Sequence, residues 1–135
     1  MEDKVVIKAF EKVDFPLFGV KGAVAKIDTG AYTGALHATN IVRTKVDGKK
    51  QLHFTPHRGK PTTVTDFRVT TVKSSDGVDA QRYVVSTVVT IRGKDYPISI
   101  TLSDRSGMKR KVLIGRRFLR QQGFMVDVSP KDRVR

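Results

Sequence analysis

Turns of two residues that end in glycine divide this chain into segments in which apolar and polar residues alternate. Such alternation is typical of β-strands that bury one face. Asp47-Gly48 predicts a two-residue hairpin turn, and a longer hairpin is predicted around Asp76-Gly77. Consecutive hairpins must bury their apolar faces against one another. The chain is therefore predicted to be all-β and to form a small barrel or sandwich.

Further strands follow from the same pattern. VVIKAF and GAVAKID are apolar runs near the N-terminus, and a third turn at Arg92-Gly93-Lys94 leads into DYPISITLS. Pro97 in that last segment has no N–H to donate to a sheet, which predicts an edge position or a bulge there.

One segment has the pattern of a helix. It is RRFLRQQ, residues 116–122, and Gly123 after it is a typical C-terminal cap. The short apolar strand KVLIG precedes the helix, and FMVDV follows it as one more strand. No repeat or linker divides the chain, so residues 1–135 are predicted to form a single domain.

Composition excludes several kinds of site. The chain has no cysteine, which excludes disulfides and thiolate metal ligands. No apolar run reaches the length of a membrane span, and the first residues include acids rather than a signal-like apolar stretch. We expect a cytoplasmic protein.

The net charge is strongly positive, with 26 Lys and Arg against 13 Asp and Glu, a formal charge of +13. This imbalance favours a polyanionic partner such as RNA or an acidic protein segment, and the alternative is a surface that is charged only for solubility. The basic C-terminal segment SPKDRVR is open to the same two interpretations.

The segment AKIDTGAYTGALHA, residues 25–38, contains the most informative motif. An apolar strand ends in Asp28-Thr29-Gly30 and is followed by small residues. Asp, Thr and Gly are common in turns, so one interpretation is a corner in which Asp28 binds its own backbone. The other interpretation is a catalytic aspartate at the mouth of a barrel.

Two later motifs favour the catalytic interpretation. LSDRSGMKRKVLIGRRFL and FMVDV lie in the C-terminal part of the chain. Together the three motifs resemble those of the RimB family, retropepsin-like aspartic peptidases that have also been labelled ATP-dependent zinc proteases. The resemblance implies a small closed barrel with one C-terminal helix, equivalent to a single lobe of an acid protease. It also implies a homodimer and a link to glutamate tails on a ribosomal protein.

Peptide hydrolysis by aspartates needs two carboxylates that share one proton, because one activates water and the other hydrogen-bonds the scissile carbonyl. This chain has one Asp-Thr-Gly, and acids such as Asp47 and Asp127 stand in other contexts. The second carboxylate is therefore expected to be Asp28 of a second subunit. By resemblance, Thr29 orients the aspartate across the dimer, and Gly30 lets the loop approach the axis.

The family label of an ATP-dependent zinc protease has no counterpart in these residues. The chain has no glycine-rich phosphate loop, and His37, His53 and His57 do not form a His-Glu-x-x-His motif. Pro56 prevents His53 and His57 from sharing a helical face, and His37 is expected to pack against the barrel. We expect no cofactor and no metal.

Two arginines are candidates for binding an acidic substrate. Arg82 and Arg105 occupy positions that are arginine in the family pattern, and an arginine fork can bind both oxygens of a carboxylate. The alternative is a structural ion pair with a neighbouring acid, Asp79 or Asp104.

Other residues near the motifs are assigned to the cleft or its support. Lys26 shares a strand face with Asp28, where its charge would oppose the shared proton, and the alternative is that it points to solvent. Arg116 is a candidate for substrate or dimer contacts, and Met108 for the apolar part of the cleft, with core packing as its alternative. Four residues are expected to support the aspartate loop: Ala31, Leu113, Ile114 and Gly115.

The predicted function is a dimeric aspartic peptidase that cleaves an acidic segment. The alternative is a non-catalytic basic barrel that binds ribosomal RNA or acidic tails, although aromatic residues make up only 7% of the chain. The polar hairpin DGKKQLHFTPHRGK is a candidate flap over the site.

Overall fold

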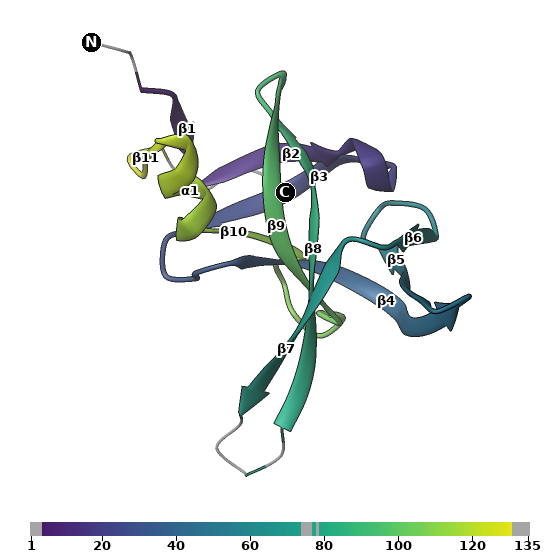
Figure 1. Cartoon of the computed structure of the whole chain (residues 1–135). Coiled ribbons are helices and arrows are strands. Elements are labelled where there is room, and N and C mark those ends of the chain that lie inside the picture. The colour runs from purple at the N-terminus through teal and green to yellow at the C-terminus, as the bar shows by residue number, and fades with distance from the viewer. Residues whose placement is uncertain (1–3, 74–76, 78, 131–135) are drawn as a thin grey trace.

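The structure is a computed structural model that describes residues 4–73, 77 and 79–130, and it consists mainly of strands (Figure 1). The elements in chain order are β1 (Val6–Lys8), β2 (Phe10–Phe15), the 3-10 turn η1 (Pro16–Phe18), β3 (Val20–Asp28), β4 (Gly34–Val46), β5 (Lys49–Pro56), β6 (Thr62–Val64), β7 (Phe67–Lys73), β8 (Asp79–Ile91), β9 (Lys94–Ser103), β10 (Val112–Gly115), α1 (Arg116–Gln122) and β11 (Met125–Asp127).

Strands β10, β3, β2, β8, β9 and β4 form a closed barrel in that order, because β4 also pairs with β10. β10 runs parallel to β3 and antiparallel to β4, so it is inserted between two strands that are consecutive in the chain. The β4–β5 and β7–β8 hairpins extend away from the barrel (Figure 1). The prediction of an all-β small barrel with one C-terminal helix is confirmed.

The predicted hairpin turns have the backbone conformation that their residues favour. Asp47 and Gly48 have φ angles of 50° and 80°, and Arg92 and Gly93 have 52° and 79°. Positive φ at both central residues matches the twist of a two-residue hairpin. Asp76 lies outside the described residues, but β7 and β8 pair on either side of it as predicted.

Pro97 lies in β9 opposite Val88 of β8. β4 pairs with β9 only along Thr101–Ser103, so the other side of β9 has no paired strand at the proline. On that open side a residue needs no N–H donor, so a proline is tolerated there. The expected edge position is confirmed, without a bulge in the β8–β9 register.

The predicted helix forms over the expected residues. α1 ends at Gln122, and Gly123 adopts the left-handed conformation with φ 69° while its N–H donates to carbonyls of the last turn. No helix in the described part of the chain is long and apolar enough to cross a membrane.

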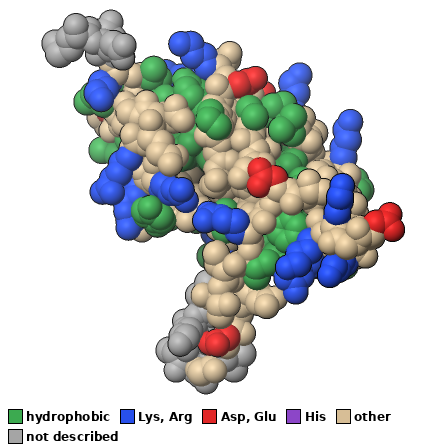
Figure 2. All heavy atoms as spheres, in the orientation of Figure 1, with side chains coloured by type: hydrophobic (Ala, Val, Ile, Leu, Met, Phe, Trp, Pro, Cys, Tyr) green, Lys and Arg blue, Asp and Glu red, His purple; other side chains and the backbone are tan. Residues whose placement is uncertain are grey.

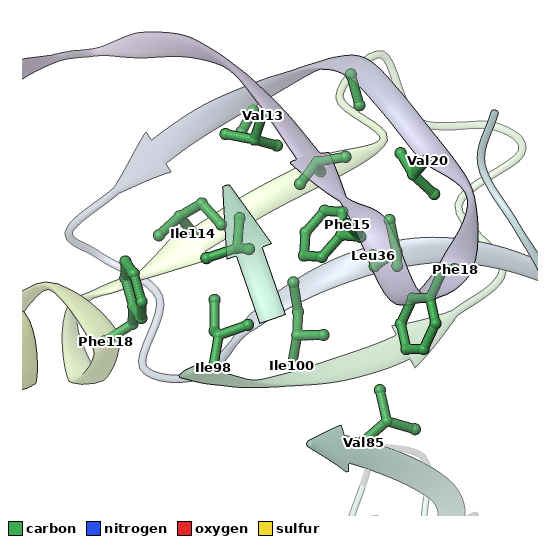
Figure 3. Close-up of a cluster of buried hydrophobic side chains, with 14 of the residues drawn as sticks. Val13, Phe15, Phe18, Val20, Leu36, Val85, Ile98, Ile100, Ile114 and Phe118 are labelled. Atoms are coloured by element: carbon green, nitrogen blue, oxygen red, sulfur yellow. The ribbon is translucent and has the colours of Figure 1, made fainter. Parts of the chain in front are cut away.

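The barrel interior holds the core. Phe15, Leu36, Ile100 and Ile114 are fully buried and come from four different strands. Figure 3 shows these side chains pointing toward one another, with Phe118 of α1 covering one end. Full burial of each such side chain stabilises the fold by about 1.5–3 kcal/mol. The alternation of apolar and polar residues along the strands places these side chains inside the barrel.

Two glycines allow β10 to fit between its neighbours. A Cβ on Gly115 would lie 2.7 Å from the Gly34 nitrogen and would overlap the Tyr32 carbonyl. Gly34 has φ +84°, and a Cβ there would overlap the Leu113 carbonyl. Both contacts involve backbone atoms, which cannot move aside as a flexible side chain could.

We expect Gly115→Ala to lower the free energy of unfolding by about 1–3 kcal/mol, because the added methyl group displaces packed backbone. Gly107→Ala is the matched control, since a Cβ there meets nothing within 4 Å. The control is expected to change stability by less than ~0.5 kcal/mol. Urea unfolding compares the two, and equal midpoints would contradict the close fit of β10.

Candidate active site

Asp28 is the last residue of β3 and is half-buried, whereas Thr29 and Gly30 after it are exposed. Its Oδ1 accepts a hydrogen bond from the Gly30 N–H at 3.0 Å, and its main-chain carbonyl accepts from the Ala31 N–H at 3.1 Å. The corner predicted by the turn interpretation is therefore present. It holds the carboxylate at the end of a barrel strand.

The start of α1 closes over this loop. The Arg116 N–H donates to the Ala31 carbonyl at 2.8 Å, and the Arg117 N–H donates to the Tyr32 carbonyl at 3.0 Å. The Arg116 guanidinium donates to the Gly30 carbonyl at 3.1 Å and lies over the Tyr32 ring, 5.3 Å from its centroid. Loop carbonyls thus satisfy N–H groups that have no partner within the helix.

β10 supports the strand that carries the aspartate. Leu113, Ile114 and Gly115 lie opposite residues 26–28 in the parallel ladder. Ile114 is fully buried, so its contact with β3 is part of the core. The structure brings these residues and Ala31 together around the aspartate loop.

A cleft of about 480 Å³ opens beside the aspartate loop. Four arginines line it, Arg68, Arg82, Arg105 and Arg117, and we call it the arginine cleft. The other lining residues are uncharged: Tyr32, Thr33, Gly34, Ala35, Thr70, Val84, Thr101 and Ser103. No carboxylate stands in this wall, so the cleft is suited to an anion.

Arg82 and Arg105, the two arginines singled out from the sequence, lie in this one cleft although they come from different segments. Sequence reasoning missed Arg68 and Arg117. Arg68 enters the cleft because β7 pairs with β8 in a register that places it opposite Val84, two residues from Arg82. In the sequence, only the predicted hairpin that pairs these two strands indicated that Arg68 lies near Arg82.

Hydrogen bonds from several directions hold Arg105. Its N–H donates to Nδ1 of His37 at 2.7 Å, and its Nε–H donates to the Arg110 carbonyl at 2.9 Å. The Lys111 ammonium donates to the Arg105 carbonyl at 2.8 Å and to two further carbonyls of the same loop. The position of this arginine is therefore set by the fold.

No carboxylate in residues 4–73, 77 and 79–130 lies within ion-pair distance of Arg82 or Arg105. Asp104, one of the two acids considered as a partner, instead accepts hydrogen bonds from Ser106. The Ser106 hydroxyl and then its N–H at 2.9 Å lower the pKa of the Asp104 carboxyl. Both arginines remain available to a bound anion.

Other candidates lie away from the cleft. Lys26 is exposed, and no ion pair joins it to Asp28 among the residues described. Met108 is 53% exposed and does not line the arginine cleft. Segment 47–60, the candidate flap, contains β5 with Leu52 fully buried, and none of its residues lines the cleft.

His37 and His53 serve the fold at the positions seen. The His37 side chain is 12% exposed and packs against the barrel as expected. The ring nitrogens of His53 hydrogen-bond the hydroxyls of Thr44 and Thr63 at 2.7 and 2.8 Å. Where the chain is described, no group of three His, Asp or Glu side chains is placed to hold a metal ion.

Residues 6–134 match the family described as "RimB-like: Retropepsin-like aspartic endopeptidase RimB". The chain belongs to this family. The resemblance drawn from the three motifs is thereby confirmed, and the RimB-like assignment covers the aspartate loop, the arginine cleft and α1 alike.

Two curated relatives of this RimB-like chain are named "Probable alpha-L-glutamate ligase". The protein from Shewanella pealeana is 32% identical over 124 residues, which are 85% of this chain and 27% of that protein. The protein from Desulfotalea psychrophila is 31% identical over 122 residues, 84% of this chain and 26% of its own length. The chain thus spans about a quarter of the length of these relatives.

A solved structure from Legionella pneumophila, of a protein with unknown function, has the same fold. It superposes with a TM-score of 0.66 at 22% identity and covers 96% of this chain and 97% of its own.

Replacing Arg116 by alanine removes the hydrogen bond to Gly30 and the contact with the Tyr32 ring. We expect faster amide exchange in residues 28–32 and a loss of about 1–2 kcal/mol in the free energy of unfolding. Arg120→Ala, on the exposed side of the same helix, is the control. Unchanged exchange in Arg116→Ala would show that this side chain does not hold the loop.

Proposed function

We propose that this chain is a homodimeric aspartic peptidase that cleaves peptide bonds in an acidic segment, with Asp28 of each subunit forming the catalytic pair. The observation that carries the proposal is the arginine cleft, whose wall begins at Tyr32, four residues after Asp28. The carboxylate at the end of β3 supplies a reacting group. The arginines beside it supply a place for an acidic chain to bind.

Two Asp28 carboxylates facing one another across a two-fold axis cannot both stay ionised, so they share one proton. The ionised carboxylate takes a proton from water, whose oxygen attacks the scissile carbonyl carbon. The protonated carboxyl hydrogen-bonds the carbonyl oxygen as negative charge develops there. When the tetrahedral intermediate collapses, the C–N bond breaks and the leaving nitrogen takes the proton that the first carboxylate removed from water. The Gly30 N–H on Oδ1 orients one oxygen, and Thr29 is exposed where a partner loop would meet it.

Two other acids of the subunit are poor candidates for an internal pair with Asp28. Asp47 occupies a hairpin turn. The Asp127 carboxylate is bound by the hydroxyl and N–H of Ser129, which lower the pKa of Asp127 and keep it ionised. A group held as a structural anion is a poor partner for a shared proton.

An apolar surface beside the loop is suited to a second copy. β1 and β11 pair in parallel, and the side chains of Val5, Val6, Met125 and Val128 near them are between 40% and 75% exposed. A cavity of about 590 Å³ lies beside this surface, lined by apolar residues of α1 and β11 together with Thr29 and the cations Lys4, Arg116 and Arg120. Burying these apolar groups on a two-fold mate would stabilise the dimer that the chemistry needs.

The substrate class follows from the arginine cleft. Guanidinium groups bind carboxylates through paired hydrogen bonds, and glutamate side chains along an extended peptide present carboxylates in series. The relatives named glutamate ligases contain a region similar to this chain. Their name indicates that they join glutamate residues, and a chain of such residues would fit the arginine cleft. We propose a glutamate tail on a cytoplasmic ribosomal protein as substrate, with no metal or cofactor.

Asp28→Asn is expected to abolish cleavage of a peptide with an oligoglutamate tail while the dimer and the fold remain, because Asn cannot exchange the proton. Mass spectrometry of the peptide and light scattering of the protein measure the two properties. A wild-type protein that binds the peptide and leaves it intact would favour the non-catalytic binding module instead.

Mixing tests the shared pair directly. If subunits exchange freely, an equal mixture of wild-type and Asp28→Asn chains should keep about a quarter of the dimers fully wild-type, and activity should fall to that share. Activity that falls only to about half would show that each Asp28 acts alone.

Single replacements of Arg82 or Arg105 by alanine are expected to cost about 2–4 kcal/mol in kcat/KM on the acidic peptide, because each leaves a desolvated carboxylate without its partner. Arg68→Ala and Arg117→Ala should act in the same direction. Lys49→Ala, an exposed cation outside the cleft, should cost less than ~1 kcal/mol. A neutral peptide cleaved as well as the acidic one would contradict the substrate class.

A further inference from the structure

Positive charge extends beyond the arginine cleft. Figure 2 shows Lys and Arg side chains at separate places around the visible face, with fewer acids. A second, smaller pocket of about 220 Å³ is lined by Val24 and five basic residues: His57, Arg58, Lys109, Arg110 and Lys111. We call it the basic pocket. None of its residues lines the arginine cleft.

The backbone holds the two walls of the basic pocket in fixed positions. The His57 N–H donates to the His37 carbonyl at 2.9 Å, and the His37 N–H donates to the Lys111 carbonyl at 2.8 Å. One residue of β4 therefore joins the turn after β5 to the loop before β10. These hydrogen bonds fix the main chain of His57 relative to that of Lys111 without a ligand.

The turn that carries Arg58 is also constrained. Arg58 has φ 59°, a left-handed conformation that is uncommon for a residue with a side chain. The Gly59 N–H donates to the Pro56 carbonyl at 3.0 Å, and the Lys60 N–H donates to the Phe18 carbonyl at 3.1 Å. The fold thus holds this arginine at the pocket in an unfavourable backbone conformation.

The basic pocket has cations without matching acids. The Arg110 guanidinium lies over the Phe10 ring, 4.2 Å from its centroid, and the Lys111 ammonium donates hydrogen bonds to three carbonyls. Within the described part of the chain, no carboxylate lies within ion-pair distance of Arg58 or Lys109. Burial lowers the pKa of His57, and the charges of neighbouring basic groups lower it further.

We propose that the basic pocket binds a phosphate group. A phosphate carries about −1.5 to −2 charges at neutral pH and presents several acceptor oxygens, so one phosphate can match the charges of both Arg58 and Lys109, which a single carboxylate cannot. The basic pocket, of about 220 Å³, has room for a phosphate group and is smaller than the arginine cleft, of about 480 Å³. The inference does not depend on the peptidase activity.

The phosphate site adjoins the arginine cleft through one loop. Arg105 at the start of that loop lines the cleft, and Lys109, Arg110 and Lys111 at its end line the basic pocket. A phosphate bound at one side therefore contacts the segment that places a substrate-binding arginine on the other.

The test follows the His57 ring by NMR while inorganic phosphate is added at constant ionic strength, with His57→Gln to assign its signal. A bound dianion offsets the surrounding positive charge, so the pKa of His57 should rise with phosphate. Arg58→Ala and Lys109→Ala should each weaken phosphate binding by about fivefold or more. Lys45→Ala and Lys50→Ala, on the β4–β5 hairpin, are charge-matched controls and should change it by less than about twofold.

Equal losses in the controls, or a His57 signal that phosphate does not move, would overturn the proposal. A single-stranded oligouridylate distinguishes the source of the phosphate. Binding that needs Arg58 and Lys109 would assign the site to a nucleic-acid backbone, and binding of inorganic phosphate alone would assign it to a free ion. An oligoglutamate peptide that occupies the pocket more tightly than phosphate would show that the site takes carboxylates and that the proposal is wrong.

Discussion

β10 is inserted between β3 and β4, and both the barrel and the aspartate loop rely on this contact. β10 supplies the last ladder that closes the barrel, and it does so between two strands that are neighbours in the chain. The fit needs backbone-to-backbone contact, which the absence of a Cβ at Gly34 and Gly115 allows. Closing the barrel pairs the free edges of β3 and β4 with β10 and encloses the apolar faces in one core.

The same insertion organises the candidate site. Because β10 runs beside the end of β3, the helix that follows it begins over the aspartate loop and binds its carbonyls. The segment before β10 places Arg105 in the arginine cleft and three further basic residues in the basic pocket. One short strand thus positions the Asp28 carboxylate, one arginine of the arginine cleft and three residues of the basic pocket.

Much of the fold could be predicted from the sequence because its determinants are local. The turns at Asp47-Gly48 and Arg92-Gly93 depend on residues that tolerate positive φ, and the cap at Gly123 does too. Alternation along each strand shows which face is buried. The 3-10 turn Pro16–Phe18 and the short strand β6 were not predicted, since three residues are too few to establish a period.

The hairpins, the helix and the aspartate motif can be recognised in the sequence, because each depends on residues close together in the chain. Which cations lie together is set only by the folded barrel. Arg68 and Arg117 join Arg82 and Arg105 only through strand register and helix placement, and Lys26 remains exposed outside the cleft. The physical reason is that long-range pairing and barrel closure set the distances between side chains from distant segments, and the period of a single strand contains no information about its partner.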